Sequence, residues 1–552
     1  MPGFPLGFIG ASLFTIGVFI IAWILAKSLK CNPSLMFQVF FGVHPGSLQN
    51  KVVWITGAGS GIGKQLALDL TKYGAKLVIH SLPGEDLDSL KEQCILLGFL
   101  IPHKPIGGSQ GKISSEDIYL IHGDITSGNL HQQWVTDALK HFGQASTVIA
   151  GSFEETSVED DRKMFEVNVF GGVQLTRALI PHFKERRKGH VVVTSSMLGR
   201  MFSPSQAVYS ACKHALFGYY QALGIEGGMY GLDVTIICPG PVKTPLIFKP
   251  FSNVNKSFID SQMLVMIPID LHGLLAGQVI WITGASSGIG EALAIRLASL
   301  KARLILSARR LEELQRVKSL CLETSLGMLS EDSILLLPMD VTETEKHSMH
   351  LETIIKHFGK LDILVNNAGR SQRAEFQRVQ VDVDRALFEL NVFGPVALAR
   401  TVLPHFVERG SGQVVITSSV MGKFAAPYSC SYAASKHALH GYFETLRAEQ
   451  ALSGVHVTLL CPGPVLTNAA QESFTDTPGQ KVGKPWGQGG RMTSERCADL
   501  IMVAIVNHID EAWISQQPVL TICYLAQYFP SFMRKAMSIL GPRMANKLRD
   551  QE

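Results

Sequence analysis

A tyrosine and a lysine four positions apart, Tyr432 and Lys436, are the residues most capable of chemistry in this sequence. Four residues make about one turn of an α-helix, so the phenol and the ammonium group lie on one face. A phenol with a pKa of about 10 transfers protons poorly at neutral pH, but neighbouring positive charge favours the phenolate. Ser419, just after the expected strand Val414–Thr417, is placed to hydrogen-bond the carbonyl oxygen that would receive the proton of the tyrosine. Together these residues predict proton transfer to a carbonyl oxygen.

A glycine-rich segment between an expected strand, Val279–Thr283, and an expected helix, Glu291–Leu300, suits binding of a dinucleotide. Small residues permit a tight turn and let the backbone approach a pyrophosphate, and the helix N-terminus supplies N–H groups and a positive dipole. A glycine-rich turn without a ligand is the alternative. The predicted phosphate loop comprises Thr283, Gly284, Ser286, Ser287, Gly288, Ile289 and Gly290.

The residue that follows the second expected strand distinguishes between two dinucleotides. About 20 residues beyond the glycines, a carboxylate would accept bonds from a ribose 2′-hydroxyl, but Arg309 stands there and suits a 2′-phosphate. NADP is therefore predicted over NAD, and the alternative is a solvated pair with Arg310. Open sheets bind ligands at the carboxyl ends of their strands. Further cofactor contacts are predicted there from Asp340, Val341, Asn367, Ala368 and Gly369.

The chain repeats itself. The segment 48–63 is echoed by 275–290, and Tyr209 with Lys213 precedes Tyr432 with Lys436 by 223 positions (432 − 209). Such a long period indicates two copies of one domain in tandem. The predicted regions are a transmembrane anchor at 1–30, a first domain at 48–250, a linker at 251–273 and a second domain at 274–552.

Short β-branched runs alternate with longer amphipathic segments in both copies, for example Lys76–His80 in the first and Leu304–Leu306 in the second. Strands separated by helical crossovers indicate a parallel sheet covered on both faces. We therefore predict an α/β fold with two tandem Rossmann-like, doubly wound parallel sheets, preceded by one N-terminal transmembrane helix.

The order of these motifs resembles that of the classical short-chain dehydrogenases/reductases: Thr-Gly-x-x-x-Gly-x-Gly, Asn-Asn-Ala-Gly, a serine, Tyr-x-x-x-Lys and Pro-Gly. The resemblance implies that Tyr432 protonates a carbonyl oxygen as hydride arrives and that Ser419 binds that oxygen. It also implies a water-linked proton relay from Asn391 to Lys436. Tyr432 and Lys436 would contact the cofactor too, together with Pro462, Gly463 and Val465.

The first copy keeps the counterparts Asn168, Ser196, Tyr209 and Lys213 but departs from the pattern elsewhere. Val148-Ile-Ala-Gly151 replaces Asn-Asn-Ala-Gly, Leu82 stands opposite Arg309, and counterparts of Thr493–His508 and Ala512–Ser515 are missing. We expect a sheet edge and an open pocket. Four interpretations stay open for this copy: nucleotide binding, an intramolecular partner in place of a homodimer subunit, inactivity, or fusion of two neighbouring gene models.

An uncharged run from Gly3 to Ala26 is longer than the roughly 20 residues that cross a bilayer, which predicts a single-pass anchor in the endoplasmic reticulum membrane. A cleaved signal peptide is the rival. Lys27 and Lys30 favour a cytosolic C-terminal bulk, whereas Asn255-Lys-Ser257 would be a glycosylation site only in the lumen. The apolar and then basic C-terminal segment from Pro518 suits either a membrane surface or packing on its own domain.

Composition limits the function classes. A net charge of +4 does not indicate a nucleic-acid partner, and nine cysteines without a CxxC pair predict neither a disulfide scaffold nor a metal site. The leading prediction is an NADP(H)-dependent oxidoreductase that interconverts a carbonyl and an alcohol on a lipophilic steroid, retinoid or similar substrate. The alternatives are a sphingoid-base ketone reductase and a non-catalytic nucleotide-binding scaffold. An intramolecular pseudo-dimer or a homo-oligomer is the expected assembly.

Overall fold

The computed structural model describes residues 51–100, 113–134, 157–240, 275–469, 471–483 and 491–529, with residues 533 and 536. Internal contacts divide the chain into two compact units, one of residues 1–122 with 141–143, the other of residues 123–140 with 144–552. The division falls inside the first copy. Part of the first copy therefore belongs to the same compact unit as the whole second copy.

The second copy forms one seven-stranded sheet in which every neighbouring pair is parallel, with the strand order β12-β11-β10-β9-β6-β7-β8. The strand order reverses between β6 and β9, which is where doubly wound sheets bind ligands. The predicted doubly wound sheet is confirmed for this copy. Its strands are β6 Val279–Thr283, β7 Arg303–Ser307, β8 Ile334–Leu336, β9 Ile363–Asn366, β10 Gly412–Thr417, β11 Val455–Pro462 and β12 Glu511–Ile514.

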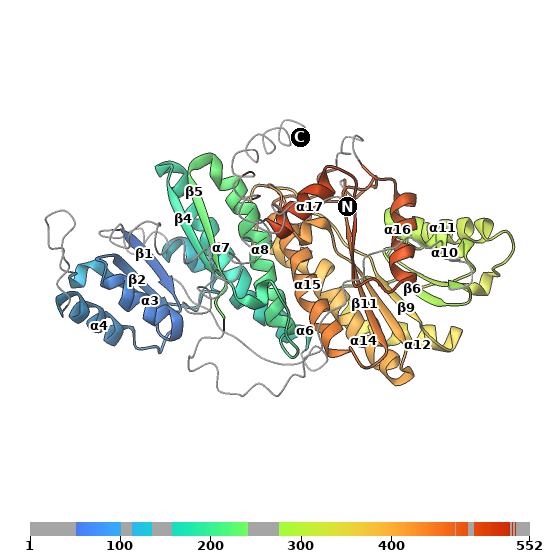
Figure 1. Ribbon diagram of the computed structural model, residues 1–552, viewed down its shortest axis with the longest axis horizontal. Coiled ribbons are helices and arrows are strands. Elements are labelled where there is room, and N and C mark those ends of the chain that lie inside the picture. Colours follow the sequence, from blue (N-terminus) through green and yellow to red (C-terminus); the bar gives the residue numbers. More distant parts are fainter. Residues whose placement is uncertain are drawn as a thin grey trace, which may run out of the picture. The chain divides into compact units, whose positions relative to one another are not determined.

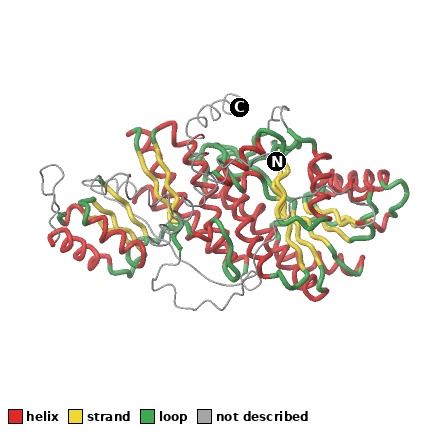
Figure 2. The backbone as a smooth tube through the Cα atoms, in the orientation of Figure 1, coloured by secondary structure: helices red, strands yellow, loops and turns green. Residues whose placement is uncertain are grey.

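Helices cover both faces of this sheet (Figures 1 and 2). Successive strand residues point to opposite faces, so Trp281 packs in one hydrophobic core and Ile280 and Ile282 in the other. The helices on the Ile280 face are α10 Gly288–Ser299, α11 Leu311–Thr324 and α16 Ser494–Val506. Those on the Trp281 face are α12 His347–Phe358, α13 Val381–Phe388, α14 Gly394–Arg409 and α15 Cys430–Glu449. The short helix α17 Val519–Tyr528 follows β12.

One helix in the described part of the chain is long and apolar enough to cross a membrane. It runs over Val381–Arg409, with a mean hydropathy of 1.4, and 72% of its most apolar window is buried in the protein. It comprises α13, the π-helical turn η9 Glu389–Phe393 and α14, so its apolar side chains serve the core. The predicted anchor from Gly3 to Ala26 lies outside the described residues.

The first compact unit holds the start of the first copy. Its strands β1 Val52–Thr56, β2 Lys76–Ser81 and β3 Ile118–His122 form a parallel sheet in that order. Helices α3 Gly61–Thr71 and α4 Leu87–Leu100 accompany them. The buried core of this unit includes Ile55, Leu77, Ile79, Leu90 and Ile118.

The remaining described part of the first copy comprises α6 Val158–Phe165, the π-helical turn η4 Glu166–Phe170, α7 Gly171–Arg186, β4 Gly189–Thr194, α8 Ala207–Gly227 and β5 Leu232–Ile237. Within the described ranges, β4 pairs only with β5. Val192 on β4 is 44% exposed, whereas its counterpart Val415 on β10 is fully buried between neighbouring strands. The described strands of the first copy are parallel, as predicted, and lie in separate sheets of three and two; the counterpart of β9 falls outside the described residues, so one doubly wound sheet stays a prediction for this copy.

Helix α8 of the first copy packs along α15 of the second (Figure 1). The two backbones approach so closely that a Cβ atom added at Gly218 would lie 2.4 Å from Ala434, and one added at Gly441 would lie 2.5 Å from Ala211. Gly218 and Gly441 are 223 positions apart, as are Ala211 and Ala434. Each helix thus uses the same pair of small residues to contact the other.

Ion pairs across this contact follow the same reciprocity. Four ion pairs join an arginine of one copy to an acidic residue of the other. For each pair, the residues at the equivalent positions, 223 positions away, form an ion pair too. This exchange of roles is the pattern of a two-fold interface. The pairs are Arg177 with Asp384, Arg400 with Asp161, Arg162 with Glu389, and Arg385 with Glu166.

Candidate active site

The predicted phosphate loop joins the end of β6 to the start of α10. Gly284 and Gly288 have positive φ angles of 66° and 61°, which a side chain would strain. A Cβ atom at Gly290 would lie 2.3 Å from the carbonyl oxygen of Gly284, so the loop closes backbone against backbone. These glycines leave the N-terminus of α10 open to the close approach of a phosphate group.

Thr283 ties this loop to the end of β9. Its Oγ1 accepts hydrogen bonds from the backbone N–H groups of Asn367 (3.0 Å) and Ala368 (3.1 Å), and Asn367 Nδ2 donates to Thr283 O (3.1 Å). The structure therefore brings together the glycine loop and the Asn-Ala-Gly segment that the sequence placed at two separate strand ends. They meet at the point where the strand order reverses.

Three of the four predicted catalytic groups converge beside Gly369. Lys436, one turn after Tyr432 on α15, donates from Nζ to Thr417 O at 2.8 Å, and this nitrogen lies 5.8 Å from the centroid of the Tyr432 ring. A Cβ atom at Gly369 would lie 3.6 Å from Lys436 Nζ and 3.0 Å from Asn391 Oδ1. Lys436 and Asn391 therefore lie close to the backbone of Gly369, where a larger side chain would press on Asn391.

Asn391 is held by a π-helical turn, an irregularity that is frequent at functional sites. Its Oδ1 accepts from Arg370 N (2.9 Å), and its Nδ2 donates to Arg370 O (2.8 Å) and to Ser435 Oγ (3.0 Å). These bonds fix the side chain next to the lysine. Whether a water links Asn391 to Lys436 stays a prediction.

Ser419 caps the short helix η10 Val420–Gly422. Its Oγ accepts from Met421 N (3.1 Å) and donates to Pro462 O (3.3 Å), so the serine connects the end of β10 with the end of β11. Gly463 follows, and its N–H donates to Ile514 O at 2.9 Å. The predicted residues Pro462 and Gly463 therefore lie at the same edge of the sheet as the serine.

Burial controls the acid–base properties of the pair on α15. It raises the pKa of Tyr432 above its ordinary value, although the hydrogen bond with Ser419 and the positive charge of Arg373 act in the opposite direction. Burial also lowers the pKa of Lys436 to about 8. Burial of a phenolate outweighs the help from these two neighbours, and the lowering expected beside a bound nicotinamide cation stays a prediction.

Arg309 lies where the sequence predicted a 2′-phosphate contact. Its side chain is 60% exposed, and its Nη1 is 3.7 Å from Asp340 Oδ2. Asp340 Oδ1 also accepts from the N–H and the hydroxyl of Thr342 at 3.0 and 2.8 Å. An exposed guanidinium with one distant carboxylate keeps most of its hydrogen-bonding capacity for an anion.

The other predicted cofactor residues lie around this loop. Ser287 is the N-cap of α10, Ser286 is buried, and Ile289 packs beside one of the two cores. Val341 is buried and its carbonyl oxygen is 3.1 Å from His347 Nε2. Val465 pairs with Met492 next to α16. These contacts are structural, and their part in cofactor binding stays a prediction.

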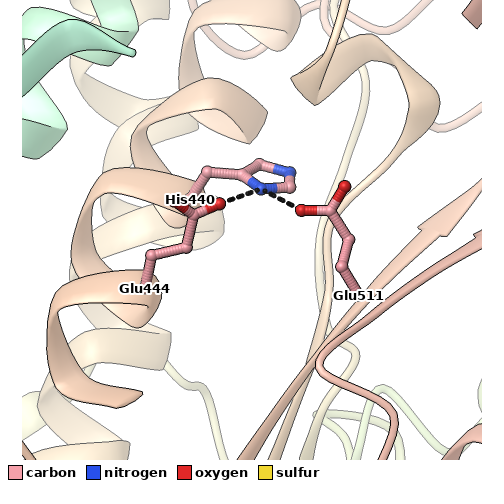
Figure 3. A group of neighbouring side chains, drawn as sticks. All are labelled: His440, Glu444 and Glu511. Atoms are coloured by element: carbon pink, nitrogen blue, oxygen red, sulfur yellow. Dashed lines mark hydrogen bonds and ion pairs between the residues drawn. The ribbon is translucent and has the colours of Figure 1, made fainter. Parts of the chain in front are cut away.

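A buried group of charged side chains lies behind the Ser419 turn, and the sequence analysis missed it. His440 Nδ1 is 3.3 Å from both Glu444 Oε1 and Glu511 Oε2 (Figure 3). Lys423 Nζ is 2.7 Å from Glu511 and 3.8 Å from Glu444. Burial and Lys423 favour neutral imidazole, yet Cys461 and then the nearby carboxylates hold the pKa of His440 above its usual range. The three acceptors have the spacing of metal ligands, but Lys423 supplies a cation to both carboxylates.

This charged group holds the Ser419 turn against α15. His440 Nε2 is 3.2 Å from Ser418 Oγ, which donates to Lys436 O at 3.1 Å, and a Cβ at Gly422 would lie 2.8 Å from the same imidazole nitrogen. The spacing of four between Lys436, His440 and Glu444 is a signal that could have been found in the sequence. The contribution of Glu511 could not have been found in this way, because it lies on the distant strand β12.

The first copy keeps part of the geometry of the candidate active site. Lys213 Nζ is 3.5 Å from Thr194 O and 5.4 Å from the Tyr209 ring centroid, and Ser196 Oγ accepts from Leu198 N. Burial lowers the pKa of Lys213 to about 8, as for its counterpart. Asn168 differs, because its Nδ2 donates to Met164 O within its own helix.

The glycine loop of the first copy belongs to the other compact unit, and its Val148–Gly151 segment lies outside the described residues. The arrangement that joins glycine loop, strand end and catalytic helix is therefore described for the second copy alone.

Comparison with known proteins identifies the family. A sequence model of the short chain dehydrogenase family matches residues 105–253 and 278–478, more than half of the chain. The chain belongs to the short-chain dehydrogenase/reductase family. The two matched regions fit the tandem arrangement predicted from the repeat, and the resemblance seen in the motifs is confirmed.

Individual members of this family match about half of the chain. The human protein "Dehydrogenase/reductase SDR family member 7" is 45% identical over 259 residues, which are 47% of this chain and 76% of the relative. A Drosophila melanogaster "Dehydrogenase/reductase SDR family protein 7-like" is 36% identical over 274 residues, 49% of this chain and 83% of the relative. A solved short-chain dehydrogenase/reductase from Burkholderia phymatum, in complex with NAD, is 24% identical over 47% of this chain and 96% of its own, with a TM-score of 0.41.

Membership of this family supports the predicted oxidoreductase class. Carbonyl–alcohol interconversion is consistent with it.

Proposed function

We propose that the second copy is an NADP(H)-dependent oxidoreductase that interconverts a carbonyl and an alcohol on a lipophilic substrate such as a steroid or retinoid. The observation that carries the proposal is the convergence of Asn391 and Lys436 at Gly369, next to the glycine loop that Thr283 ties to the same strand end. This combination supports turnover, because residue types capable of proton transfer lie beside a glycine loop suited to a phosphate, and a scaffold without turnover does not need them.

The residues present fit a nicotinamide dinucleotide. Gly284, Gly288 and Gly290 form a cradle that any Cβ would fill, the N-terminus of α10 favours a pyrophosphate, and Arg309 is exposed for a 2′-phosphate. When bound, the cofactor supplies or accepts the hydride. All further steps belong to side chains of this chain.

Tyr432 is the proposed proton donor to the carbonyl oxygen during reduction. Burial raises the pKa of this phenol, which favours the protonated hydroxyl that a proton donor requires, and Ser419 is the second hydrogen-bond partner of the reacting oxygen. Lys436, with a pKa near 8, is an ammonium ion at neutral pH and stabilises the phenolate that the transfer leaves behind. In the oxidation direction the phenolate of Tyr432 accepts the proton of the alcohol, and the ammonium group of Lys436 stabilises that phenolate beforehand.

The lipophilic substrate and the membrane location rest on sequence. The uncharged run from Gly3 to Ala26 supports a single-pass anchor, and an anchored enzyme meets substrates dissolved in the bilayer. We propose the endoplasmic reticulum as the location. The first copy is proposed to occupy the place of a partner subunit, as supported by the reciprocal contacts of α8 and α15.

The decisive experiment compares two tyrosines. The purified full chain is given NADPH and a panel of steroids, retinals, quinones and long-chain ketones. Tyr432→Phe removes the proposed proton donor and keeps the ring, so kcat should fall by about a thousandfold while the Kd for NADPH stays within about twofold. Tyr209→Phe, the matched change in the first copy, should leave kcat nearly intact. Near-normal turnover of Tyr432→Phe, or an equal loss from both changes, would contradict the proposal.

A further inference from the structure

A glutamate of the first copy reaches into the second. Glu226, in the last turn of α8, is 5% exposed and accepts hydrogen bonds from the backbone N–H groups of Phe376 and Tyr428, both at 2.8 Å. These two peptides belong to different loops of the second copy. One carboxylate from the first copy therefore bridges two separate segments of the second.

Both segments flank the candidate catalytic residues. The first runs on from the Asn-Ala-Gly segment after β9, and the second ends four residues before Tyr432. They also contact each other directly, because Ala374 N donates to Tyr428 O at 3.1 Å and the guanidinium of Arg373 donates to Ser429 Oγ. Tyr428 has a φ of 60°, a strained conformation for a residue with a side chain, which persists only when its surroundings hold it.

The first of these segments supports a further part of the site. Ser371 O accepts from Phe474 N at 2.9 Å and Arg373 N donates to Phe474 O at 2.8 Å, so the two stretches run as a short ladder. Phe474 lies in the stretch 471–483, which follows the cofactor residues at the end of β11. A shift of Phe376 would thus displace two segments, one that contains Tyr428 before Tyr432 and one that contains Phe474 after it.

Arg177 of the first copy holds the same peptide from its other side. Its Nε donates to Phe376 O at 2.8 Å, and its guanidinium carbon lies 5.2 Å from the centre of the Phe376 ring. Phe376 therefore has its N–H bound by Glu226 and its C=O bound by Arg177. Both partners come from the first copy, and both are buried.

We propose that the first copy is a positioning subunit for the active site of the second, and that Glu226 is its positioning residue, locking the loops of Phe376 and Tyr428 in the arrangement that admits substrate to Tyr432. This inference rests on the proposed function of the second copy. It gives the first copy a role that requires no turnover of its own.

The reciprocal contact provides an internal control. Glu449 is the counterpart of Glu226 (449 − 226 = 223) and accepts from the backbone N–H of Ser205, the counterpart of Tyr428, at 2.7 Å. This bond is exposed and holds a loop of the first copy. Glu449 thus has the same chemistry and the same interface, but it acts in the opposite direction.

The carboxylate of Glu226 titrates near neutrality. Burial raises its pKa to about 7, against the two N–H bonds that lower it, and Glu375 raises it further while Lys184 lowers it. Tyr230 and Cys430 face the same carboxylate, and their own pKa values are raised in part by its charge. Because the charged form is the better acceptor of two N–H bonds, the lock should weaken as the pH falls below about 7.

Amide hydrogen exchange on the full chain tests the lock directly, with no need for substrate. Glu226→Gln keeps the size but places an NH2 group against an N–H, so exchange of the peptides that contain Phe376 and Tyr428 should speed up by about tenfold. Glu449→Gln should leave these two peptides unchanged and speed up exchange at Ser205. Glu226→Asp keeps the charge on a shorter arm and should give an intermediate rate. It serves as the second variant if Glu226→Gln does not fold.

Loss of the lock should weaken the use of substrate and leave the binding of cofactor almost unchanged. Glu226→Gln should raise KM for the carbonyl substrate about tenfold, leave the Kd for NADPH within about twofold, and remove the pH dependence of KM around pH 7. Unchanged exchange at Phe376 and Tyr428, or an equal rise in KM from Glu449→Gln, would overturn the inference. A wild-type chain that turns over no carbonyl would instead refute the proposed function, and the exchange result would still decide whether Glu226 locks the loops.

Discussion

Removing the carboxylate of Asp384 tests whether the two copies depend on each other for stability. Asp384 is fully buried and accepts from Arg177 of the first copy, from Tyr219 Oη (2.9 Å) and from Ser431 Oγ (2.6 Å). Asp384→Asn keeps the size of the side chain but leaves the buried Arg177 guanidinium, which is 8% exposed, without its charge partner. Breaking a buried pair on one side costs about 3–5 kcal/mol, because the remaining charge is uncompensated.

That loss converts into a measurable shift of the melting temperature. Large domains lose about 2 °C of Tm per kcal/mol, so Asp384→Asn should lower the Tm of the full chain by about 6–10 °C. Glu389→Gln is the matched control, because Glu389 pairs with Arg162 across the same interface but the two side chains are 28% and 34% exposed. A partly exposed pair is screened by solvent and is worth about 1 kcal/mol at most, so this change should lower Tm by no more than about 2 °C.

Differential scanning calorimetry of the full chain measures both shifts at one protein concentration. Exchange of the two charges, Arg177→Asp together with Asp384→Arg, should recover part of the loss, since the pair is rebuilt with reversed polarity. Equal small shifts from Asp384→Asn and Glu389→Gln would refute the argument that buried reciprocal pairs join the copies. A double charge exchange that is no better than the single change would refute the pairing itself.

Two further changes test the cofactor and the proton donor. Arg309→Asp replaces attraction to a 2′-phosphate by repulsion, so the kcat/KM ratio for NADPH over NADH should fall by at least about tenfold, and an unchanged ratio would show that another residue sets the preference. Lys436 has a pKa near 8, so kcat/KM for reduction should be level below pH 8 and fall above it as the ammonium is lost. Lys436→Arg should move that fall upward by more than one pH unit, and an unmoved profile would assign it to another group.

The glycine loop and the helix that carries Tyr432 and Lys436 could be predicted because their signals are local. Val279–Thr283 and Val414–Thr417 read as strands from their apolar β-branched runs, and both form strands that are buried on two faces. The four-residue spacing of Tyr432 and Lys436 placed them on one face of α15, where the structure has them. In each case the residues that decide the geometry lie within about a dozen positions of one another.

The contacts between the copies could not be predicted, because nothing in a single sequence pairs Glu226 with Phe376 or Arg177 with Asp384. Each pair is formed by residues that are 150 to 207 positions apart. The charged group around His440 was missed for a related reason. Its helical half is readable from spacing, but Glu511 comes from the last strand of the sheet and Lys423 from the turn after Ser419.

Exposure separates the two copies more clearly than sequence does. β4 and β10 have almost the same residues, Gly-His-Val-Val-Val-Thr and Gly-Gln-Val-Val-Ile-Thr, yet most of β4 is at least partly exposed and most of β10 is buried. β10 lies between β9 and β11, whereas β4 pairs with β5 alone among the described strands.

The retained motif of the first copy has an explanation that does not involve catalysis. Lys213 contacts the carbonyl oxygen of Thr194 at the end of β4, and Tyr209 packs beside the main hydrophobic core. Both stand at the start of α8, the helix that carries Gly218 into contact with α15 and Glu226 into the loops of the second copy. By keeping α8 in place, these residues would support the candidate active site of the second copy, because α8 carries the contacts to its loops. The retained Tyr209 and Lys213 are then evidence that the helix α8 is preserved, not that the first copy turns over. Comparing Tyr209→Phe with Tyr432→Phe separates this structural role from turnover.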